Sequence, residues 1–216
     1  VWVGSDIAKF LNGKGIAGIV VKYRLPSDVY QINKLNVPLI DAQRALRMVR
    51  YHAKDFNITK DKIGVIGFSA GGHLASTLGT HFLESVYDAI DTADTESARP
   101  DFMVLGYPVI SMGPMTHEGS KANLLGKNPT QKLQDYFSNE KQVTTNTPPT
   151  FLLHATDDNA VPVENSLLFY KALKDKGVSA TMHIFPNGGH GFSLALNDQY
   201  LKGWTALMYE WIVSLE

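Results

Sequence analysis

The sequence predicts an α/β fold in which a mostly parallel β-sheet carries helices on both of its faces. Short β-rich runs alternate with segments of helical periodicity along the chain, which is the order that builds a parallel sheet. These runs are also largely apolar, as is typical of strands that are buried on both faces. With 216 residues, 44% of them hydrophobic, the chain is long enough for a substantial core, and we expect residues 1–216 to form a single domain.

Five short runs are predicted to be strands, and they follow one another at intervals that leave room for helices between them. The first is expected to be a buried strand that ends at Pro26. The runs are GIAGIVVKYRL (15–25), KIGVIGF (62–68), DFMVLGYPV (101–109), TFLLHAT (150–156) and ATMHIFP (180–186).

The segment that follows Pro38 is predicted to be a helix with that proline near its first turn. Its apolar residues are spaced 3, 4, 3, 4 and 3 positions apart, which places them on one helix face; they are Leu39, Ala42, Leu46, Val49, Ala53 and Phe56. Further helices are predicted at about 71–82, 163–176 and 199–215. The alternation breaks between 110 and 149, where we expect irregular chain that serves as a lid or a pocket wall.

The composition excludes several classes of function. The 20 Lys and Arg balance 21 Asp and Glu, and the basic residues are scattered, so neither nucleic acid nor an anionic membrane is expected as a partner. Because the chain has no cysteine, it has no disulfide and no thiolate metal site. No apolar run reaches the ~20 residues of a membrane-spanning helix, and the first residues lack the layout of a signal peptide.

The stretch GFSAGGH (67–73) surrounds Ser69 with small residues where a predicted strand runs into a predicted helix. So sharp a turn strains the serine backbone and demands neighbours without bulky side chains. We expect Gly67 and Gly71 to allow close approach of strand and helix, and Gly72 to relieve the crowding further. The hydroxyl of Ser69 is then exposed at the carboxyl end of the strand, where open α/β sheets bind ligands.

The helix start directs backbone N–H groups to the same point, and we predict that the N–H of Ala70 stabilises an oxyanion there. The pattern G-x-S-x-G at a strand-to-helix turn resembles the nucleophile elbow of α/β hydrolases. A glycine-rich phosphate loop is the alternative interpretation, and it is disfavoured because the chain contains neither GxGxxG nor GK[ST].

A serine hydroxyl needs a base, and the base needs a carboxylate that orients it. His190 is the predicted base, because it lies between two glycines on a loop that can bring its ring close to Ser69. Asp157 and Asp158 compete for the third role. The H-x-x-x-D spacing that starts at His154 and the pattern D-x-x-V-P both favour Asp158, which leaves Asp157 as a loop-capping residue.

The remaining histidines are interpreted as structural, since none shows the spacing of a metal site. We therefore expect no metal and no other cofactor. These histidines are His73 and His81 on the helix after the elbow, His154 and His183 in strands, His52 on an exposed helix face and His117 in the irregular region. His117 could reach the pocket from that region, but a lone histidine on a loop is more often a bystander than a ligand.

With these residues in hand, the chain resembles α/β-hydrolase carboxylesterases of the acetyl-xylan-esterase-like group over essentially its whole length. The resemblance rests on VVKYRLP (20–26), VPLIDAQRALRMVR (37–50), IGVIGFSAGGHLAST (63–77), RPDFMVLGYPVISM (99–112), SNEKQV (138–143), HATDDNAVPVENSLLFYKAL (154–173) and GGHGF (188–192). It implies that Ser69, Asp158 and His190 form a catalytic triad. It also implies hydrolysis of short acyl esters, among them acetyl groups on a carbohydrate such as xylan.

The chain departs from this group at its beginning. Members carry a glycine-rich segment upstream of the helix that IAKFLNGKG (7–15) matches, and that segment supplies a second oxyanion donor. It follows a strand which, by family topology, lies between the runs at 15–25 and 62–68. Without that strand the sheet would expose unpaired backbone groups. We therefore expect the chain to be incomplete at its N-terminus, or its sheet to close in an atypical way.

The substrate pocket is expected to draw on residues 107–125, with Tyr107, Met112 and Met115 as candidate contacts to a small-molecule or carbohydrate ester. Tyr107 has an alternative role, in which it simply packs at the end of a strand. The sequence does not indicate an oligomeric state, and it does not fix a compartment, although the resemblance is compatible with export.

Two other functions fit parts of the pattern. A serine peptidase of the prolyl-oligopeptidase kind shares the elbow and the D-x-x-V-P loop, but such enzymes usually carry an aromatic residue where this chain has Ala70. A hydrolase-fold binding module that has lost catalysis is the second alternative. The presence of all three candidate triad residues argues against it, whereas the lack of the expected glycine-rich segment argues for it.

Overall fold

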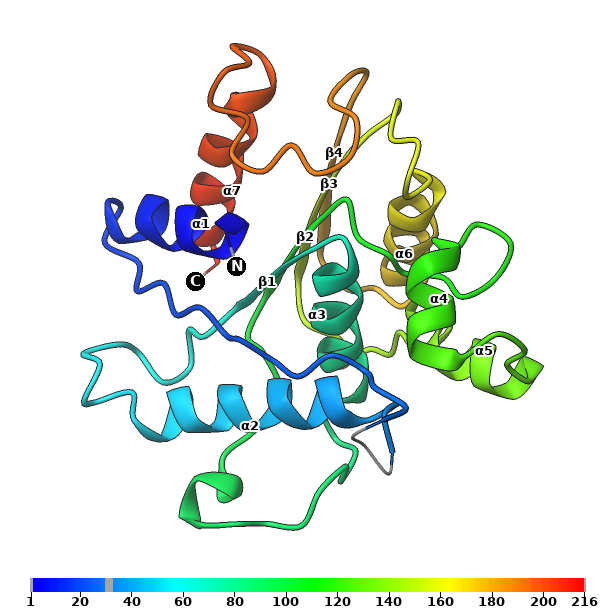
Figure 1. Ribbon diagram of the computed structural model, residues 1–216. Helices are drawn as coiled ribbons and strands as arrows, with labels where there is room; N and C mark the ends of the chain where they lie inside the picture. The colour runs from blue at the N-terminus through cyan, green and yellow to red at the C-terminus, as the bar shows by residue number, and fades with distance from the viewer. Residues whose placement is uncertain (1, 30–32, 216) are drawn as a thin grey trace.

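A computed structural model of the protein describes residues 2–29 and 33–215, and at its centre lies a parallel β-sheet (Figure 1). Its four strands are β1 (Val65–Phe68), β2 (Met103–Gly106), β3 (Thr150–Ala155) and β4 (Ala180–Phe185), and they lie side by side in that order. Each neighbouring pair is parallel. Four of the five predicted strands, and the predicted parallel sheet, are therefore confirmed.

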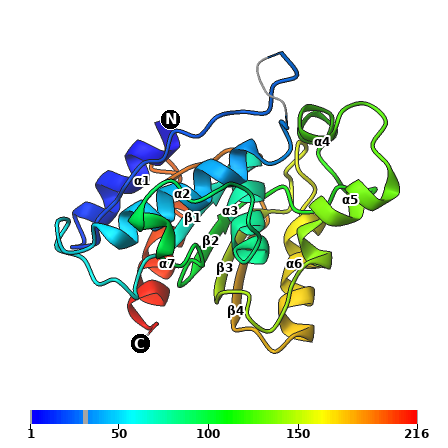
Figure 2. The same ribbon diagram turned by 90° about the horizontal axis from the view of Figure 1, so that it is seen from below.

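Helices cover both faces of the sheet, as predicted (Figure 1). On one face, α1 (Trp2–Asn12) and α7 (Trp204–Val213) bury Ile7 and Trp204 against Phe151 of β3. On the other, α3 (Ala70–His81) and α6 (Glu164–Asp175) pack against β2 and β3. The helix α2 (Val37–Tyr51) packs on the outer side of α3 (Figure 2).

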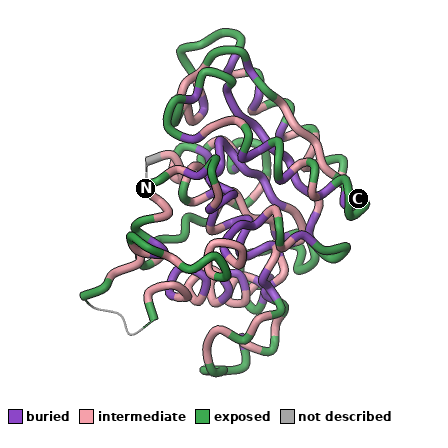
Figure 3. The backbone as a smooth tube through the Cα atoms, turned by 90° about the vertical axis from the view of Figure 1, so that its right-hand side faces the viewer, coloured by how far each residue is buried: buried purple, intermediate pink, exposed green. Residues whose placement is uncertain are grey.

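The two central strands account for the deepest part of the core. Every residue of β2 and β3 is buried, and Figure 3 shows buried chain running through the middle of the molecule with exposed loops around it. A strand that is covered on both faces has no solvent side, so the usual alternation of apolar and polar residues disappears. This is why these strands read as nearly continuous apolar runs in the sequence.

The run at 15–25 is not a strand, and this prediction is wrong. The segment is extended, but no strand of the described residues pairs with it, and Ile19, Val20 and Val21 are 45–47% exposed. An extended segment becomes a strand only when its backbone groups find a partner. The segment is held instead by Arg24, whose backbone N–H and guanidinium donate to the carboxylate of Asp41 on α2.

The predicted helix after Pro38 is shorter than its apolar pattern. The helix α2 begins at Val37 with Pro38 in its first turn and ends at Tyr51, so that Ala53 and Phe56 lie in the turns that follow. His52 accordingly caps the end of α2 instead of lying on its face. The predicted helices at 71–82, 163–176 and 199–215 correspond to α3, α6 and α7, with a 3₁₀ turn (Leu201–Gly203) at the start of the last.

The region 110–149 is not irregular throughout, which corrects a second prediction. It contains α4 (Glu118–Leu125) and α5 (Gln131–Phe137), besides a 3₁₀ turn at Asn139–Lys141. Side chains of His117 and Thr130 cap the two helices by accepting backbone N–H groups. Both helices attach to the carboxyl side of the sheet through a small apolar cluster made of Val109, Met112, Leu124, Leu125, Phe137 and Val161.

Within the described ranges 2–29 and 33–215, no helix combines the length and the apolar character that crossing a membrane requires.

Candidate active site

Ser69 occupies a strained turn between β1 and α3. Its backbone has φ 54° and ψ −123°, a conformation that costs a non-glycine residue of order 1–3 kcal/mol and persists only where the surroundings enforce it. Here the end of β2 enforces it. The N–H of Ser69 donates to the carbonyl of Gly106 at 3.0 Å, and the carbonyl of Ser69 accepts from Val109 at 3.0 Å.

Two of the three glycines around Ser69 are required by close packing. A Cβ at position 67 would lie 2.2 Å from the carbonyl oxygen of Gly71, and one at position 72 would lie 2.6 Å from the side chain of Pro108. Gly71 is different, because a Cβ there would meet only the hydroxyl of Tyr23, at 3.8 Å. The expectation that Gly71 must itself lack a side chain to let strand and helix approach is therefore wrong.

His190 lies on the loop after β4 and faces Ser69. Its Nε2 is 2.8 Å from the Ser69 Oγ. The flanking Gly189 and Gly191 have φ of 59° and 82°, values that residues other than glycine rarely adopt. Asp157 accepts the N–H of Gly189 at 2.7 Å, so it holds the loop that carries His190, in the capping role that the sequence suggests for it.

Asp158, and not Asp157, contacts the imidazole. Its Oδ2 is 2.7 Å from His190 Nδ1, while its Oδ1 accepts the N–H groups of Ala160 and Val161 at 2.9 Å each. Burial by itself would raise the pKa of Asp158, but the N–H groups of Val161 and Ala160 and the ring of His190 outweigh it and hold this pKa below its ordinary value. The carboxylate is therefore ionised at neutral pH.

These contacts fix the proton positions on His190. A carboxylate only accepts hydrogen bonds, so the hydrogen-bond network assigns the ring proton to Nδ1 and leaves the lone pair of Nε2 facing the hydroxyl of Ser69. A neutral imidazole in this tautomer can take the serine proton, and the carboxylate can stabilise the cation that results. The structure thus brings Ser69, His190 and Asp158 together in an arrangement capable of nucleophilic catalysis.

Ala70 is the first residue of α3, beside Ser69. The first N–H groups of a helix have no partner within the helix and carry its positive end. In this helix the N–H groups of Gly72 and His73 donate back to the carbonyl of Ser69. The oxyanion-donor role predicted for the N–H of Ala70 stays a prediction.

Of the three candidate substrate contacts, only Met115 presents surface to solvent. It is 44% exposed, whereas Tyr107 and Met112 are each 1% exposed. The hydroxyl of Tyr107 accepts the N–H of Ser193, and its ring packs edge-on against His190 at a centroid distance of 5.1 Å. Burial raises the pKa of Tyr107 to about 12. In this structure Tyr107 therefore packs against the loop that carries His190. Neither Tyr107 nor Met112 offers surface to a substrate.

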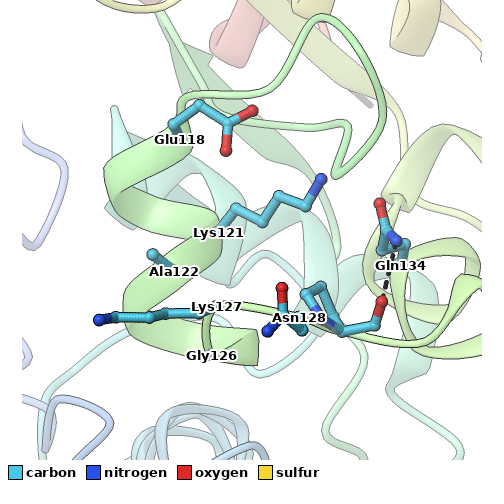
Figure 4. Close-up of a pocket in the computed structure, with 8 residues that line it drawn as sticks. Glu118, Lys121, Ala122, Gly126, Lys127, Asn128 and Gln134 are labelled. Carbon is cyan, nitrogen blue, oxygen red and sulfur yellow. Dashed lines mark hydrogen bonds between the residues drawn. The ribbon is translucent and has the colours of Figure 1, made fainter.

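A cavity of about 270 Å³ lies between α4 and α5 (Figure 4). In Figure 4 the side chain of Lys121 extends across it toward Gln134. None of Ser69, Asp158 and His190 lines it; its walls are Glu118, Lys121, Ala122, Gly126, Lys127, Asn128, Pro129 and Gln134. Across residues 2–29 and 33–215, no group of three or more His, Cys, Asp or Glu side chains is arranged to hold a metal ion.

Sequence reasoning missed Asn165, which joins the walls of the site. This residue, on the first turn of α6, is completely buried. Its Oδ1 accepts the N–H groups of Ile110 and Ser111, and its Nδ2 donates to the carbonyls of Met115 and Pro162. It thereby ties the loop after β2 to the loop that carries Asp158. The available signal was an amide three residues after the D-x-x-V-P pattern, at a position where a helix would otherwise present an apolar residue to the core.

The class of protein follows from this fold and site, and solved structures agree with it. The structure is similar to the crystal structure of an α/β hydrolase enzyme from a Medee basin deep-sea metagenome library, with a TM-score of 0.72 and 27% identity over 98% of this chain and 76% of that one. It is also similar to an acetyl ester-xyloside bifunctional hydrolase from Caldicellulosiruptor lactoaceticus, with a TM-score of 0.90 and 48% identity over 97% of this chain and 75% of that one. The fold is that of the α/β hydrolases, as the sequence predicts.

Within this class the chain belongs to the BD-FAE family, whose model matches residues 3–173. It is also 35% identical to the acetylxylan esterase of Xylanibacter ruminicola, over 98% of this chain and 42% of that protein. The chain spans less than half the length of the curated relatives that it matches. The resemblance to acetyl-xylan-esterase-like hydrolases is thus confirmed at the level of family and fold.

Proposed function

We propose that this chain carries the catalytic machinery of a serine carboxylic-ester hydrolase, with Ser69 as nucleophile, His190 as general base and acid, and Asp158 as the carboxylate that orients His190. One observation carries the proposal. Two hydrogen bonds in sequence, 2.8 Å from Ser69 Oγ to His190 Nε2 and 2.7 Å from His190 Nδ1 to Asp158, begin at a strained strand-to-helix turn. Nucleophile, base and orienting group in this order are what acyl transfer through a serine requires.

The reaction has two halves. His190 takes the proton of Ser69 as its Oγ attacks the ester carbonyl, and the N–H of Ala70 donates to the oxygen of the tetrahedral intermediate. His190 then protonates the departing alcohol, which leaves an acyl group on Ser69. In the second half a water loses its proton to His190 and attacks the acyl carbonyl, and the proton returns to Ser69 as the acid leaves. No cofactor takes part in these steps.

For the substrate we propose short acyl esters, in particular acetyl esters on a xylan-type carbohydrate. The support is the similarity to one protein named as an acetylxylan esterase and to another named as an acetyl ester-xyloside hydrolase. Met115 is the exposed candidate for contact with the substrate. It lies on the loop after β2, which Asn165 ties to the loop that carries Asp158 (the acid loop).

The test is hydrolysis of p-nitrophenyl acetate by the wild-type chain and by Ser69→Ala. We expect turnover by the wild type, and its loss in the variant by a factor of about 10⁴ or more. Acetylated xylan and a proline-containing amide are then compared as substrates, and release of acetate without cleavage of the amide supports the esterase over a peptidase. Turnover that survives Ser69→Ala contradicts the assignment of the nucleophile.

A further inference from the structure

A second histidine, besides His190, contacts Asp158. This residue, His154, is in β3 and is completely buried. Its Nε2 is 3.3 Å from Asp158 Oδ2, the same oxygen that faces His190, and 2.9 Å from the carbonyl oxygen of Val161. On the other side of the ring, Nδ1 is 2.8 Å from the hydroxyl of Ser166, at the start of α6.

The partners of His154 define its tautomer. A carbonyl only accepts hydrogen bonds, so Nε2 carries the proton and donates it to Val161, with Asp158 Oδ2 close by at 3.3 Å. It follows that Nδ1 is bare and accepts the hydroxyl proton of Ser166. Burial lowers the pKa of His154, against opposing contributions from Val161 and Asp158, which agrees with a ring that stays neutral. Asp158 and His190 are the titratable groups that bear on it.

The carboxylate of Asp158 is therefore enclosed by donors. Its Oδ1 receives two backbone N–H groups, and its Oδ2 is hydrogen-bonded to Nδ1 of His190 and lies 3.3 Å from the protonated Nε2 of His154. The side chain has no exposure to bulk solvent. The two bonds to Oδ1 fix one oxygen, and the only side chain besides His190 that the described residues place on Oδ2 is His154.

We propose that His154 is a positioning residue, held in one tautomer by Ser166, that keeps Oδ2 of Asp158 directed at His190 and moderates the charge it presents there. This inference rests on the proposed function of Ser69, His190 and Asp158. His154 touches neither substrate nor reacting atoms, so its effect passes entirely through Asp158. It ties the carboxylate to the backbone of the acid loop and to the first turn of α6.

The experiment compares His154→Leu, which removes the donor, with His154→Gln, whose amide restores an N–H near the position of Nε2. His183→Leu is the matched control, because it makes the same change in the neighbouring strand β4, where the ring packs on Phe151 away from the site. For each variant, kcat, KM and the pH profile of kcat/KM on p-nitrophenyl acetate are measured, and the folded fraction is taken from thermal unfolding.

We expect kcat of His154→Leu to fall by about tenfold to a hundredfold with KM nearly unchanged, which is the loss that a small displacement of a catalytic group produces. The acid limb of its profile moves to higher pH, since the carboxylate presents more negative charge to the imidazolium of His190. The Gln variant returns both quantities toward the wild type, and His183→Leu leaves the limb in place. If the Leu variant does not fold, Ser166→Ala carries the test and moves the limb in the same direction by less.

The proposal is overturned if the acid limb stays in place in His154→Leu and Ser166→Ala, or if the Leu and Gln variants lose activity equally and only in proportion to their folded fraction. Ser69→Ala separates this failure from that of the proposed function. A wild type whose activity depends on Ser69, together with an unaltered His154→Leu, contradicts only the role of His154. Activity that is independent of Ser69 contradicts the esterase assignment itself.

Discussion

The loop that carries Asp158 and the extended segment at 15–25 differ in how their polarity relates to their burial. The acid loop is polar in sequence, yet backbone N–H groups, two histidines and Asn165 hold it in one arrangement. The segment at 15–25 is the more apolar of the two, yet it pairs with no strand of the described residues and leaves Ile19, Val20 and Val21 about half exposed. Apolar composition alone therefore does not bury a segment, and polar composition does not expose one whose groups find hydrogen-bond partners in the core.

The sharpest way to test this contrast is within the acid loop, where two adjacent carboxylates have different partners. We expect Asp158→Asn to lower kcat by about 10⁴, because an amide at this position leaves His190 in the wrong tautomer. Asp157→Asn keeps an acceptor for the N–H of Gly189 and should change kcat by less than about tenfold. Steady-state kinetics of the two variants on p-nitrophenyl acetate measure the difference, and equal losses would contradict the assignment of Asp158.

The elbow offers a second matched pair, measured as the free energy of unfolding. Gly67→Ala places a Cβ 2.2 Å from the carbonyl oxygen of Gly71, and we expect it to destabilise the chain by about 3 kcal/mol. Gly71→Ala meets only an ordinary contact with Tyr23, and in a helical position it should be neutral or stabilising by up to about 1 kcal/mol. Urea unfolding of both variants decides, and a large loss at position 71 would mean that the packing at the elbow differs from that described.

A buried histidine on α3 makes the free energy of unfolding depend on pH. Burial lowers the pKa of His73 on α3 to about 4, whereas a histidine in the unfolded chain titrates near 6.5. Between these values the unfolded state binds more protons, so the free energy of unfolding falls as the pH is lowered from about 6.5 to 4, by about 3 kcal/mol from this group.

The variant His73→Gln keeps an N–H donor for the carbonyl of Phe137, which the ring contacts at 2.9 Å, but cannot take up a proton. We therefore expect a smaller loss of stability between pH 7.5 and pH 4.5 in this variant than in the wild type. Urea unfolding at the two pH values provides the measurement. Parallel curves for the two proteins would show that His73 is not the group responsible.

The smallest expected effects lie in the extended segment. Val104 in β2 has no exposure and Val21 is 45% exposed. Val104→Thr buries a hydroxyl in the apolar core and should cost about 2 kcal/mol, whereas Val21→Thr should change the free energy of unfolding by less than about 0.5 kcal/mol. A comparable loss at both positions would indicate that residues 15–25 are packed as tightly as a strand.

Much of the fold could be predicted because its signals are local. The strands β1 to β4 are recognisable in the sequence as short apolar runs. Parallel strands bring their carboxyl ends to one edge of the sheet, so the convergence of Ser69, Asp158 and His190 follows from topology. The run at 15–25 has the same local signal. The strand prediction is wrong for this run because strand pairing depends on a partner that is distant in sequence, and the run itself does not encode that partner.

The remaining errors have other physical causes. The helices α4 and α5 are short and polar, and they depend on capping by His117 and Thr130 and on a few apolar contacts, which periodicity does not reveal. The direction of a side chain at a turn is equally hidden, so the sequence wrongly assigns a packing requirement to Gly71 and leaves both roles of Tyr107 open, of which the structure shows packing at the end of a strand. The roles of His154 and Asn165 appear only when the loops after β2 and β3 are seen together.

The most direct test of the central claim is mass spectrometry of the chain after reaction with a fluorophosphonate ester, in which the oxygen of an activated serine displaces fluoride from phosphorus. The account predicts one adduct per chain, located on the peptide that contains Ser69, and its absence in the variants Ser69→Ala and His190→Ala. A chain that hydrolyses p-nitrophenyl acetate while Ser69 stays unlabelled and the adduct lies elsewhere would contradict the account.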